Sequence, residues 1–192
     1  MMTTNAQPNR LLLIVLFAIS ALFVLTTAPH AQTQDRPQPN PEQKKLQAWI
    51  GEWKYDVQTK QTPLGPAEKF SGTITYRWVL NAFYMEGKWS EKHADGVVKG
   101  EEWHWYDPAA KTHNVNAYGD DGYVTIGTET VTGTTWTSMN TQTDGKGQVS
   151  KVRTSGTISA DGKTYLGTWD LSMDEGKTWI PWWEIKLTKV RN

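Results

Sequence analysis

The sequence predicts an all-β fold, an antiparallel up-and-down barrel of about ten strands with one short helix before it. From Trp53 onward, apolar and polar residues alternate with a period of two, which is typical of strands with one buried face. Turn-forming residues interrupt the pattern nine times, at Gly65, Asn81, Asp95 with Gly96, Pro108, Asp121 with Gly122, Gly133, Asp144 with Gly145, Asp161 with Gly162, and Glu175 with Gly176. The segments lack the length for helical crossovers, so the strands are antiparallel, and closure removes the exposed edges.

Residues 1–31 have the layout of a secretory signal peptide. Arg10 precedes an uncharged apolar run from Leu11 to Leu25, and small residues follow between Ala28 and Ala31. We expect cleavage after Ala31 and export to the periplasm or the medium, which leaves no membrane attachment. An uncleaved anchor is the alternative, because Leu11 to Ala28 is long enough for a membrane span of about 17 residues or more.

Two parts follow the signal peptide: a flexible, Pro-rich leader at residues 32–41 and a single domain at residues 42–192. The chain has no cysteine, so the core alone stabilises the domain. Its 20 basic and 20 acidic residues balance, and no basic patch predicts a nucleic-acid partner. The 11 Trp and 7 Tyr indicate an aromatic core, and the polar tips of these side chains suit a cavity.

One short helix is predicted at the start of the domain. Asn40 is a good N-cap, and Pro41 fits the first helical position. The apolar residues that follow, Leu46, Trp49 and Ile50, lie on one helical face, and Gly51 ends the turn.

The alternating pattern selects the residues that we expect to line a cavity. Between Phe70 and Leu80, the apolar residues Phe70, Ile74, Tyr76, Trp78 and Leu80 share one face, and similar alternation recurs along later strands. The predicted ligand-binding wall consists of Tyr76, Trp78, Trp89, Trp103, Trp105, Trp169 and Trp183. The ligand is a small, partly apolar molecule, and neither its identity nor the oligomeric state follows from the sequence. Arg77 is expected outside the barrel, and the face of Arg153 is undetermined.

The motif Gly51-Glu52-Trp53 resembles the N-terminal signature of lipocalin-like (calycin-like) barrels. The resemblance implies that Trp53 packs across the barrel floor and that a late basic residue, here Arg191, lies over its ring. Residues 42–191 also resemble an uncharacterised family of exported bacterial calycin-like barrels, through Trp49 to Trp53, Tyr106-Asp107-Pro108 and Asp174 to Trp179. The family implies a fold and a pocket but no activity.

The segment from Ser172 to Trp179 matches the Asp-box pattern Ser-x-Asp-x-Gly-x-Thr-Trp. It resembles the hairpin turns of sialidase-type propellers, in which the Asp side chain bonds turn amides and the Trp packs beneath. A propeller repeats this motif in each blade, whereas it occurs here once. We therefore expect Asp174 and Trp179 to brace a turn.

No cofactor is predicted. Some ten-stranded calycin-like barrels hold haem through a histidine on a late strand, but no histidine follows His113. A metal site formed by His104, Glu102 and His113 is an alternative that depends on strand register, because a slip of one residue moves His113 to the other face.

Two alternatives to ligand binding remain. The protein is an enzyme of the hydrolase type, or it is a structural or interaction module whose barrel is filled with side chains. A hydrolase needs carboxylates or histidines that converge inside the barrel, and a glycosidase needs two carboxylates across the bond. The candidates, Glu86, Glu101, Glu102, Asp170 and Glu184, are too many for the sequence to separate, and no motif has catalytic spacing.

Overall fold

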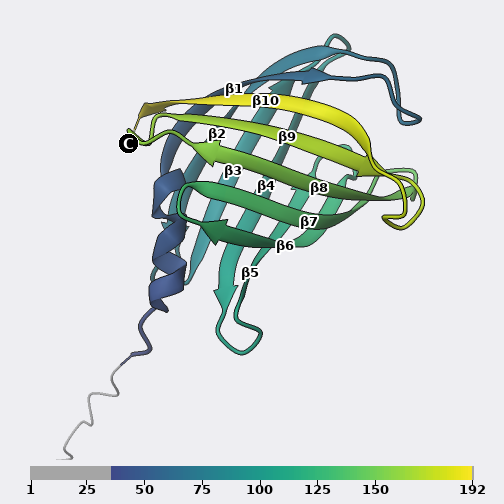
Figure 1. Cartoon of the computed structure of the whole chain (residues 1–192). Helices are drawn as coiled ribbons and strands as arrows, with labels where there is room; N and C mark the ends of the chain where they lie inside the picture. Colours follow the sequence, from purple (N-terminus) through teal and green to yellow (C-terminus); the bar gives the residue numbers. More distant parts are fainter. Residues whose placement is uncertain (1–35, 192) are drawn as a thin grey trace, which may run out of the picture. The chain divides into compact units, whose positions relative to one another are not determined.

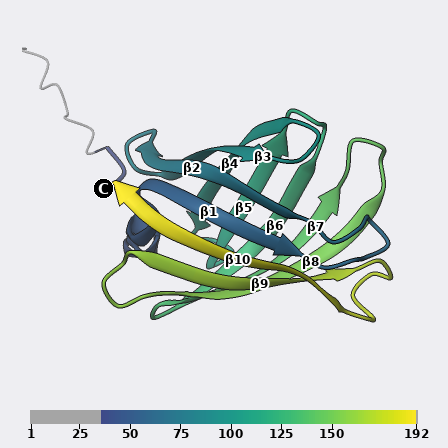
Figure 2. The same ribbon diagram turned by 90° about the horizontal axis from the view of Figure 1, so that it is seen from above.

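The structure is a computed structural model that describes residues 36–191, so the predicted signal peptide lies outside the described residues. Ten strands form one closed antiparallel barrel, and each strand pairs with its neighbours in the sequence while β10 pairs with β1. The strands are β1 Gly51–Thr59, β2 Lys69–Val79, β3 Tyr84–Lys92, β4 Val97–Asp107, β5 Thr112–Gly119, β6 Val124–Thr132, β7 Thr135–Thr143, β8 Val149–Ile158, β9 Thr164–Ser172 and β10 Ile180–Arg191. The predicted fold class is confirmed, and each of the nine predicted turns lies between two strands (Figures 1 and 2).

A 3-10 helix, η1 (Pro41–Trp49), lies at one end of the barrel, near the C-terminal end of β10 (Figure 1). The Asn40 side chain accepts a hydrogen bond of 2.9 Å from the backbone N–H of Glu42, as expected of an N-cap. We call the end of the barrel where η1 lies the floor. The opposite end, where the loops 60–68, 93–96, 120–123, 144–148 and 173–179 lie, is the mouth. No helix within residues 36–191 has the length and apolar character needed to span a membrane.

Aromatic rings from η1 and the strands form the core at the floor. The Trp49 ring lies at the centre of this cluster, with ring centroids 5.5 Å from Trp53, 5.4 Å from Trp136 and 4.9 Å from Tyr165. Trp53 and Leu46 are fully buried. Burying such large rings supplies the core that the few aliphatic residues do not.

Glycines on the inner face make room for these rings against the wall. A Cβ at Gly72 would meet the Tyr55 ring, and one at Gly100 would meet the Trp89 ring. The Tyr165 ring covers Gly156 in the same way. Because each ring occupies the space that a wall side chain would fill, it lies along the wall and not across the lumen.

Candidate functional site

The register of the sheet separates the predicted wall into three groups. Tyr76 and Trp78 face inward but belong to the floor, where Trp78 Nε1 donates a 2.7 Å hydrogen bond to Gln47 of η1. Trp89, Trp169 and Trp183 face inward above the floor and stay partly exposed.

The remaining two, Trp103 and Trp105, do not line the lumen, and their prediction is wrong. Met85 pairs with His104, and Met85 lies on the inner face, so the neighbours of His104 point outward. Both Trp rings contact Tyr84 on the outer face, with centroids 6.4 Å and 6.1 Å away. Alternation shows that two residues share a face, but not which face is inside.

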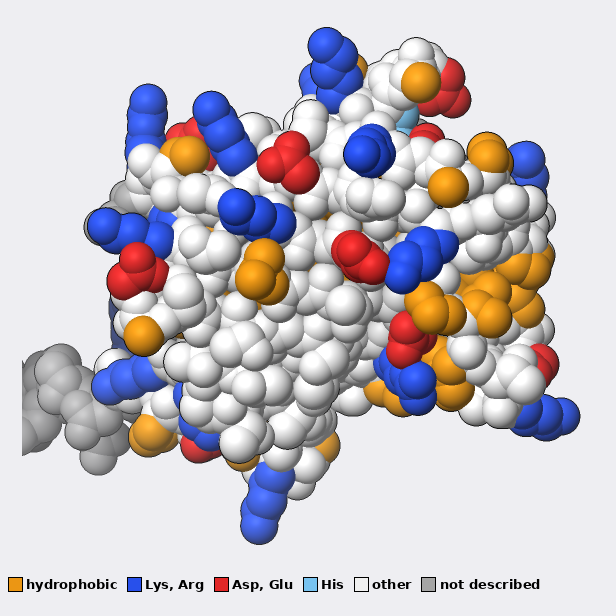
Figure 3. Space-filling view, turned by 45° about the horizontal axis from the view of Figure 1, so that its top comes forward, with side chains coloured by type: hydrophobic (Ala, Val, Ile, Leu, Met, Phe, Trp, Pro, Cys, Tyr) orange, Lys and Arg blue, Asp and Glu red, His pale blue; other side chains and the backbone are white. Residues whose placement is uncertain are grey.

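An aromatic stack lies at the mouth. The rings of Trp169 and Trp183 are parallel within 9°, with centroids 4.4 Å apart, and Phe70 meets Trp183 edge-on at 5.2 Å. The buried Nε1 of Trp183 has no hydrogen-bond partner within residues 36–191. Hydrophobic side chains are visible at this end of the molecule, on the right of Figure 3. The stack therefore offers flat apolar surface beside the lumen.

The lumen contains a carboxylate–histidine–carboxylate cluster. His104 Nε2 donates to Glu102 Oε1 at 2.9 Å, and His104 Nδ1 donates to Glu129 Oε2 at 3.0 Å. The Tyr76 hydroxyl also donates to Glu102 Oε1, at 2.5 Å. Burial lowers the pKa of His104, but the two carboxylates outweigh it and raise the pKa to about 10. The imidazole is therefore protonated at neutral pH.

A second cluster of the same kind lies nearer the mouth. His93 lies between Glu91, at 3.2 Å, and Glu68, at 3.1 Å, and the Tyr55 hydroxyl donates to Glu91 at 2.9 Å. Burial raises the pKa of Glu91, against the bonds from Tyr55 and His93 that lower it. The pKa of His93 is raised, because these carboxylates outweigh the effect of burial.

Sequence reasoning found only part of these clusters. It grouped Glu102 with His104 but missed Glu129, Glu91 and Glu68. The local signal was Glu-x-His, two residues on one face of a strand. The partner Glu129 is 25 residues from His104 in sequence, and the pairing of β4 and β6 with β5 brings the two together on the inner face.

The register also answers the question of a metal site. His104 and His113 both face inward, because Val115 pairs with His104 and Tyr106 with His113. Yet His113 contacts Glu42 of η1 at 3.8 Å, and both ring nitrogens of His104 already donate to carboxylates. Within residues 36–191, no group of three such side chains is arranged to hold a metal ion.

The five candidate carboxylates of a glycosidase do not converge. Only Glu102 faces the lumen. Glu86, Asp170 and Glu184 form ion pairs on the outer face with Arg77 at 2.5 Å, Arg153 at 2.9 Å and Lys60 at 2.8 Å. Glu101 alternates with Glu102 and also points outward. Arg77 and Arg153 are thus both outside, and neither draws an anion into the lumen.

The residue over Trp53 is Lys189, not Arg191. Lys189 Nζ lies 4.8 Å from the centroid of the Trp53 ring and donates to the carbonyl oxygens of Ala48 and Ile50, each at 2.9 Å. Arg191 is largely exposed and lies 3.8 Å from Glu52. Trp53 pairs with Lys189 in the register, whereas Arg191 is two residues farther along and past a bulge.

Asp174 accepts hydrogen bonds within its hairpin turn. Its carboxylate accepts from the Ser172 hydroxyl at 2.8 Å and from the Thr178 N–H and hydroxyl at 2.8 and 2.7 Å. These bonds lower the pKa of Asp174 to about 2. Trp179 packs under the guanidinium of Arg153, 4.7 Å from the ring centroid. Hydrogen bonds within the turn thus account for Asp174, whereas Trp179 contacts the neighbouring strand β8.

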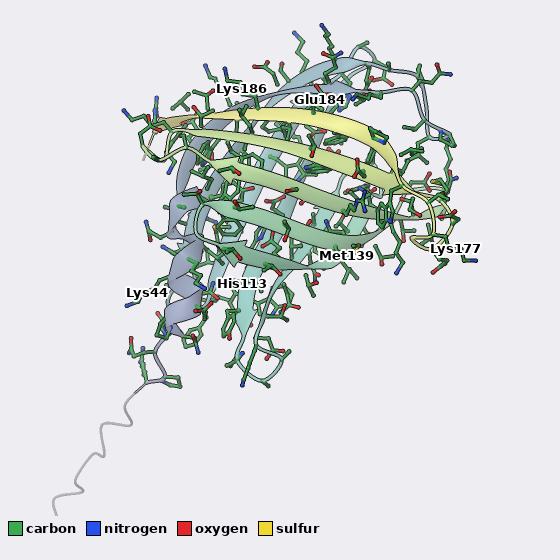
Figure 4. All side chains as sticks on the ribbon, viewed as in Figure 1. Lys44, His113, Met139, Lys177, Glu184 and Lys186 are labelled. Carbon is green, nitrogen blue, oxygen red and sulfur yellow. The ribbon has the colours of Figure 1, made fainter. Side chains whose placement is uncertain are left out.

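Two hollows open on the outer wall. One, of about 1040 Å³, is lined mainly by outward side chains of β1, β2, β9 and β10, among them Glu184 and Lys186 (Figure 4). The other, of about 340 Å³, is lined by Thr side chains, Met139, Arg153 and Asp170. Neither hollow is lined by Glu91, Glu102 or Glu129. The larger one also borders Phe70 of the aromatic stack and His93 of the second cluster.

Comparisons with known proteins agree with the fold. Residues 38–121 match the profile of a family described as "Protein of unknown function (DUF1579)". No curated protein matches the chain. The crystal structure of Rv2717c from M. tuberculosis is similar over 80% of this chain and 100% of its own, with 13% identity and a TM-score of 0.55. The S-type phycobiliprotein lyase CPES from Guillardia theta is similar over 79% and 93%, with 10% identity and a TM-score of 0.53.

These likenesses are in fold, and the chain is a lipocalin-like barrel that resembles a family of unknown function.

Proposed function

We propose that this protein is exported and that its barrel binds a small, partly apolar molecule in the lumen. The observation that carries the proposal is the partial exposure of side chains that face inward. The carboxylates of Glu102 and Glu129 retain 18% and 14% of their exposed surface, although both lie inside the barrel. A filled barrel would bury them completely. Aromatic rings with a few polar groups are the usual lining of small-molecule sites.

Native mass spectrometry of the protein from its own exported fraction tests both parts of this proposal. The denatured mass reports whether cleavage follows Ala31. A native excess that disappears on denaturation is a bound ligand, and its mass indicates the ligand's class. Protein that stays in the cell fraction with residues 1–31 still attached would contradict export.

Binding in the lumen is tested with the neutral apolar dye Nile red and a pair of neighbouring substitutions. Thr154 faces inward, and Ser155 faces outward beside it. Thr154→Phe narrows the lumen and should abolish the dye's fluorescence gain, whereas Ser155→Phe should preserve it. The reverse result would assign binding to the larger outer hollow, which Ser155 lines and Thr154 does not. No gain in the wild-type protein would favour a filled structural barrel.

A further inference from the structure

We propose that the lumen selects a ligand whose apolar body carries an amine or ammonium group, and that it rejects anions such as fatty acids. This inference rests on the proposed binding function and adds the class of ligand. It follows from the distribution of charge between the two faces of the wall, from free acceptor atoms inside, and from aromatic rings on the same inner face.

Charge is divided between the faces of the barrel. Within residues 36–191, the Lys and Arg side chains of β2 to β9 occupy outward positions, whereas Glu91, Glu102 and Glu129 face inward. Lys189 faces inward at the floor, but its ammonium is held by Trp53 and two backbone carbonyls. The fixed cations of the strands are therefore not available to an anionic ligand in the lumen.

The cluster around His104, which lies inside the barrel, contains more carboxylates than imidazoles. In the second cluster Glu68 belongs to the loop at the mouth, and its side chain is 44% exposed. Glu102 and Glu129 share His104, and Glu91 and Glu68 share His93. His113 adds no compensating charge, because burial lowers its pKa. One carboxylate of the pair Glu102 and Glu129 thus remains without a counter-charge, and a positively charged ligand would supply it.

Free acceptor atoms indicate where that charge would lie. Both hydrogen bonds to Glu102 end on Oε1, and the bond to Glu129 ends on Oε2, so Glu102 Oε2 and Glu129 Oε1 have no partner within the described chain. The neighbouring strand β7 adds an independent acceptor. Asn140 is 92% buried, and its amide donates to Ser138 Oγ at 2.7 Å. Its Oδ1 lies against Gly127 on the inner face and has no hydrogen-bond partner within residues 36–191.

Asn140 and Glu129 belong to one region of the inner wall. Ser138, which accepts from Asn140, lies directly opposite Glu129 in the register of β6 and β7. A buried acceptor without a donor is costly, so a donor from a ligand would stabilise it. An ammonium group provides three such donors and a positive charge.

Aromatic rings on the inner face provide contacts for both the cation and the apolar body of the ligand. The partly exposed inward rings of Trp89, Trp169 and Trp183 offer faces that attract cations and pack apolar groups. Carboxylates and ring faces together recognise a cation with an apolar body, whereas a carboxylate ligand would meet like charge.

Three probes with the same body separate the possibilities: 4-phenylbutylamine, 4-phenylbutan-1-ol and 4-phenylbutyrate. We expect calorimetric titration at pH 7 to show the amine binding about tenfold tighter than the alcohol, and the acid weaker than the alcohol. Equal affinities for amine and alcohol, or tightest binding of the acid, would overturn the inference but leave the binding function in place. Failure of all three probes to bind would contradict both.

Substitutions test whether Glu129 causes the preference for the amine over the alcohol. Glu129→Gln should remove most of the amine's advantage and leave the alcohol's affinity unchanged, and Glu129→Asp should restore selectivity. Glu101→Gln, on the outer face of β4, is the matched control and should change nothing. A urea midpoint for each variant establishes that it folds. Unchanged amine selectivity in a folded Glu129→Gln would overturn the assignment to this cluster.

Discussion

Nδ1 of His104 on β4 lies 3.0 Å from Oε2 of Glu129 on β6, so a hydrogen bond joins two strands that are not neighbours in the sheet. Strand β5 lies between them, and the bond passes over its inner face. The other ring nitrogen of His104 donates to Glu102 of β4. His104 therefore links β4 to β6 from inside the lumen. The cluster is therefore a structural element of the barrel as well as part of the candidate site.

Removing the imidazolium of His104, which two carboxylates share, should lower the free energy of unfolding. In His104→Leu, Glu102 and Glu129 face each other without the imidazolium between them, and we expect a loss of about 3–5 kcal/mol in the free energy of unfolding. Glu129→Gln keeps the cation and one carboxylate and should cost only about 1–2 kcal/mol. Urea denaturation measures both. Equal losses in the two variants would contradict the shared role of His104.

Stability should fall at alkaline pH. The pKa of His104 is about 10 in the folded protein, against an ordinary value of 6.5. Its contribution is therefore complete below pH 6.5 and is lost as the pH rises toward 10, by an amount on the order of a few kcal/mol. The groups around it are Glu102, Glu129 and Tyr76, with His113 nearby.

Urea midpoints at pH 6, 8 and 10, in the wild-type protein and in His104→Gln, measure this loss. The variant should lack the part of the pH dependence that belongs to His104. Parallel curves for the two proteins would show that another group titrates.

Lys189 and Arg191 should differ in their effect on the floor. Lys189→Met removes two hydrogen bonds and the contact with Trp53, and we expect a cost of about 1–2 kcal/mol. Arg191→Met removes one long, exposed ion pair and should cost less than about 0.5 kcal/mol. Thermal unfolding of the two variants measures the difference. A larger effect at Arg191 would favour the original prediction that Arg191, and not Lys189, lies over the Trp53 ring.

Glycines under aromatic rings should not tolerate a methyl group. In Gly72→Ala the new Cβ would overlap the Tyr55 ring and lie 2.6 Å from the Ser90 carbonyl oxygen, so we expect a loss of about 1–3 kcal/mol. At Gly65, in the loop between β1 and β2, nothing lies within 4 Å, and Gly65→Ala is the matched control. Similar midpoints for both variants would mean that the Tyr55 ring moves aside without cost.

Local chemistry accounts for what could be predicted. Asn40 and Pro41 mark the start of η1, and the nine groups of turn residues lie at the nine strand connections. Each of these signals depends on the backbone preferences of one or two residues. The face of β4 could not be predicted in this way, because Trp103 and Trp105 look the same in sequence whether they point into the lumen or away from it.

By itself, the sequence determined the number of strands, their antiparallel order, the position of the helix and the aromatic character of the core. Short-range preferences and a period of two carry that information. Which face of each strand is inside, the contact of Lys189 with Trp53, and the hydrogen bond of Glu129 with His104 are features of the folded barrel. The contact of Lys189 with Trp53 depends on closure of the barrel between β1 and β10, and that of Glu129 with His104 depends on the register of β4, β5 and β6. Both join residues far apart in the chain and leave no local pattern.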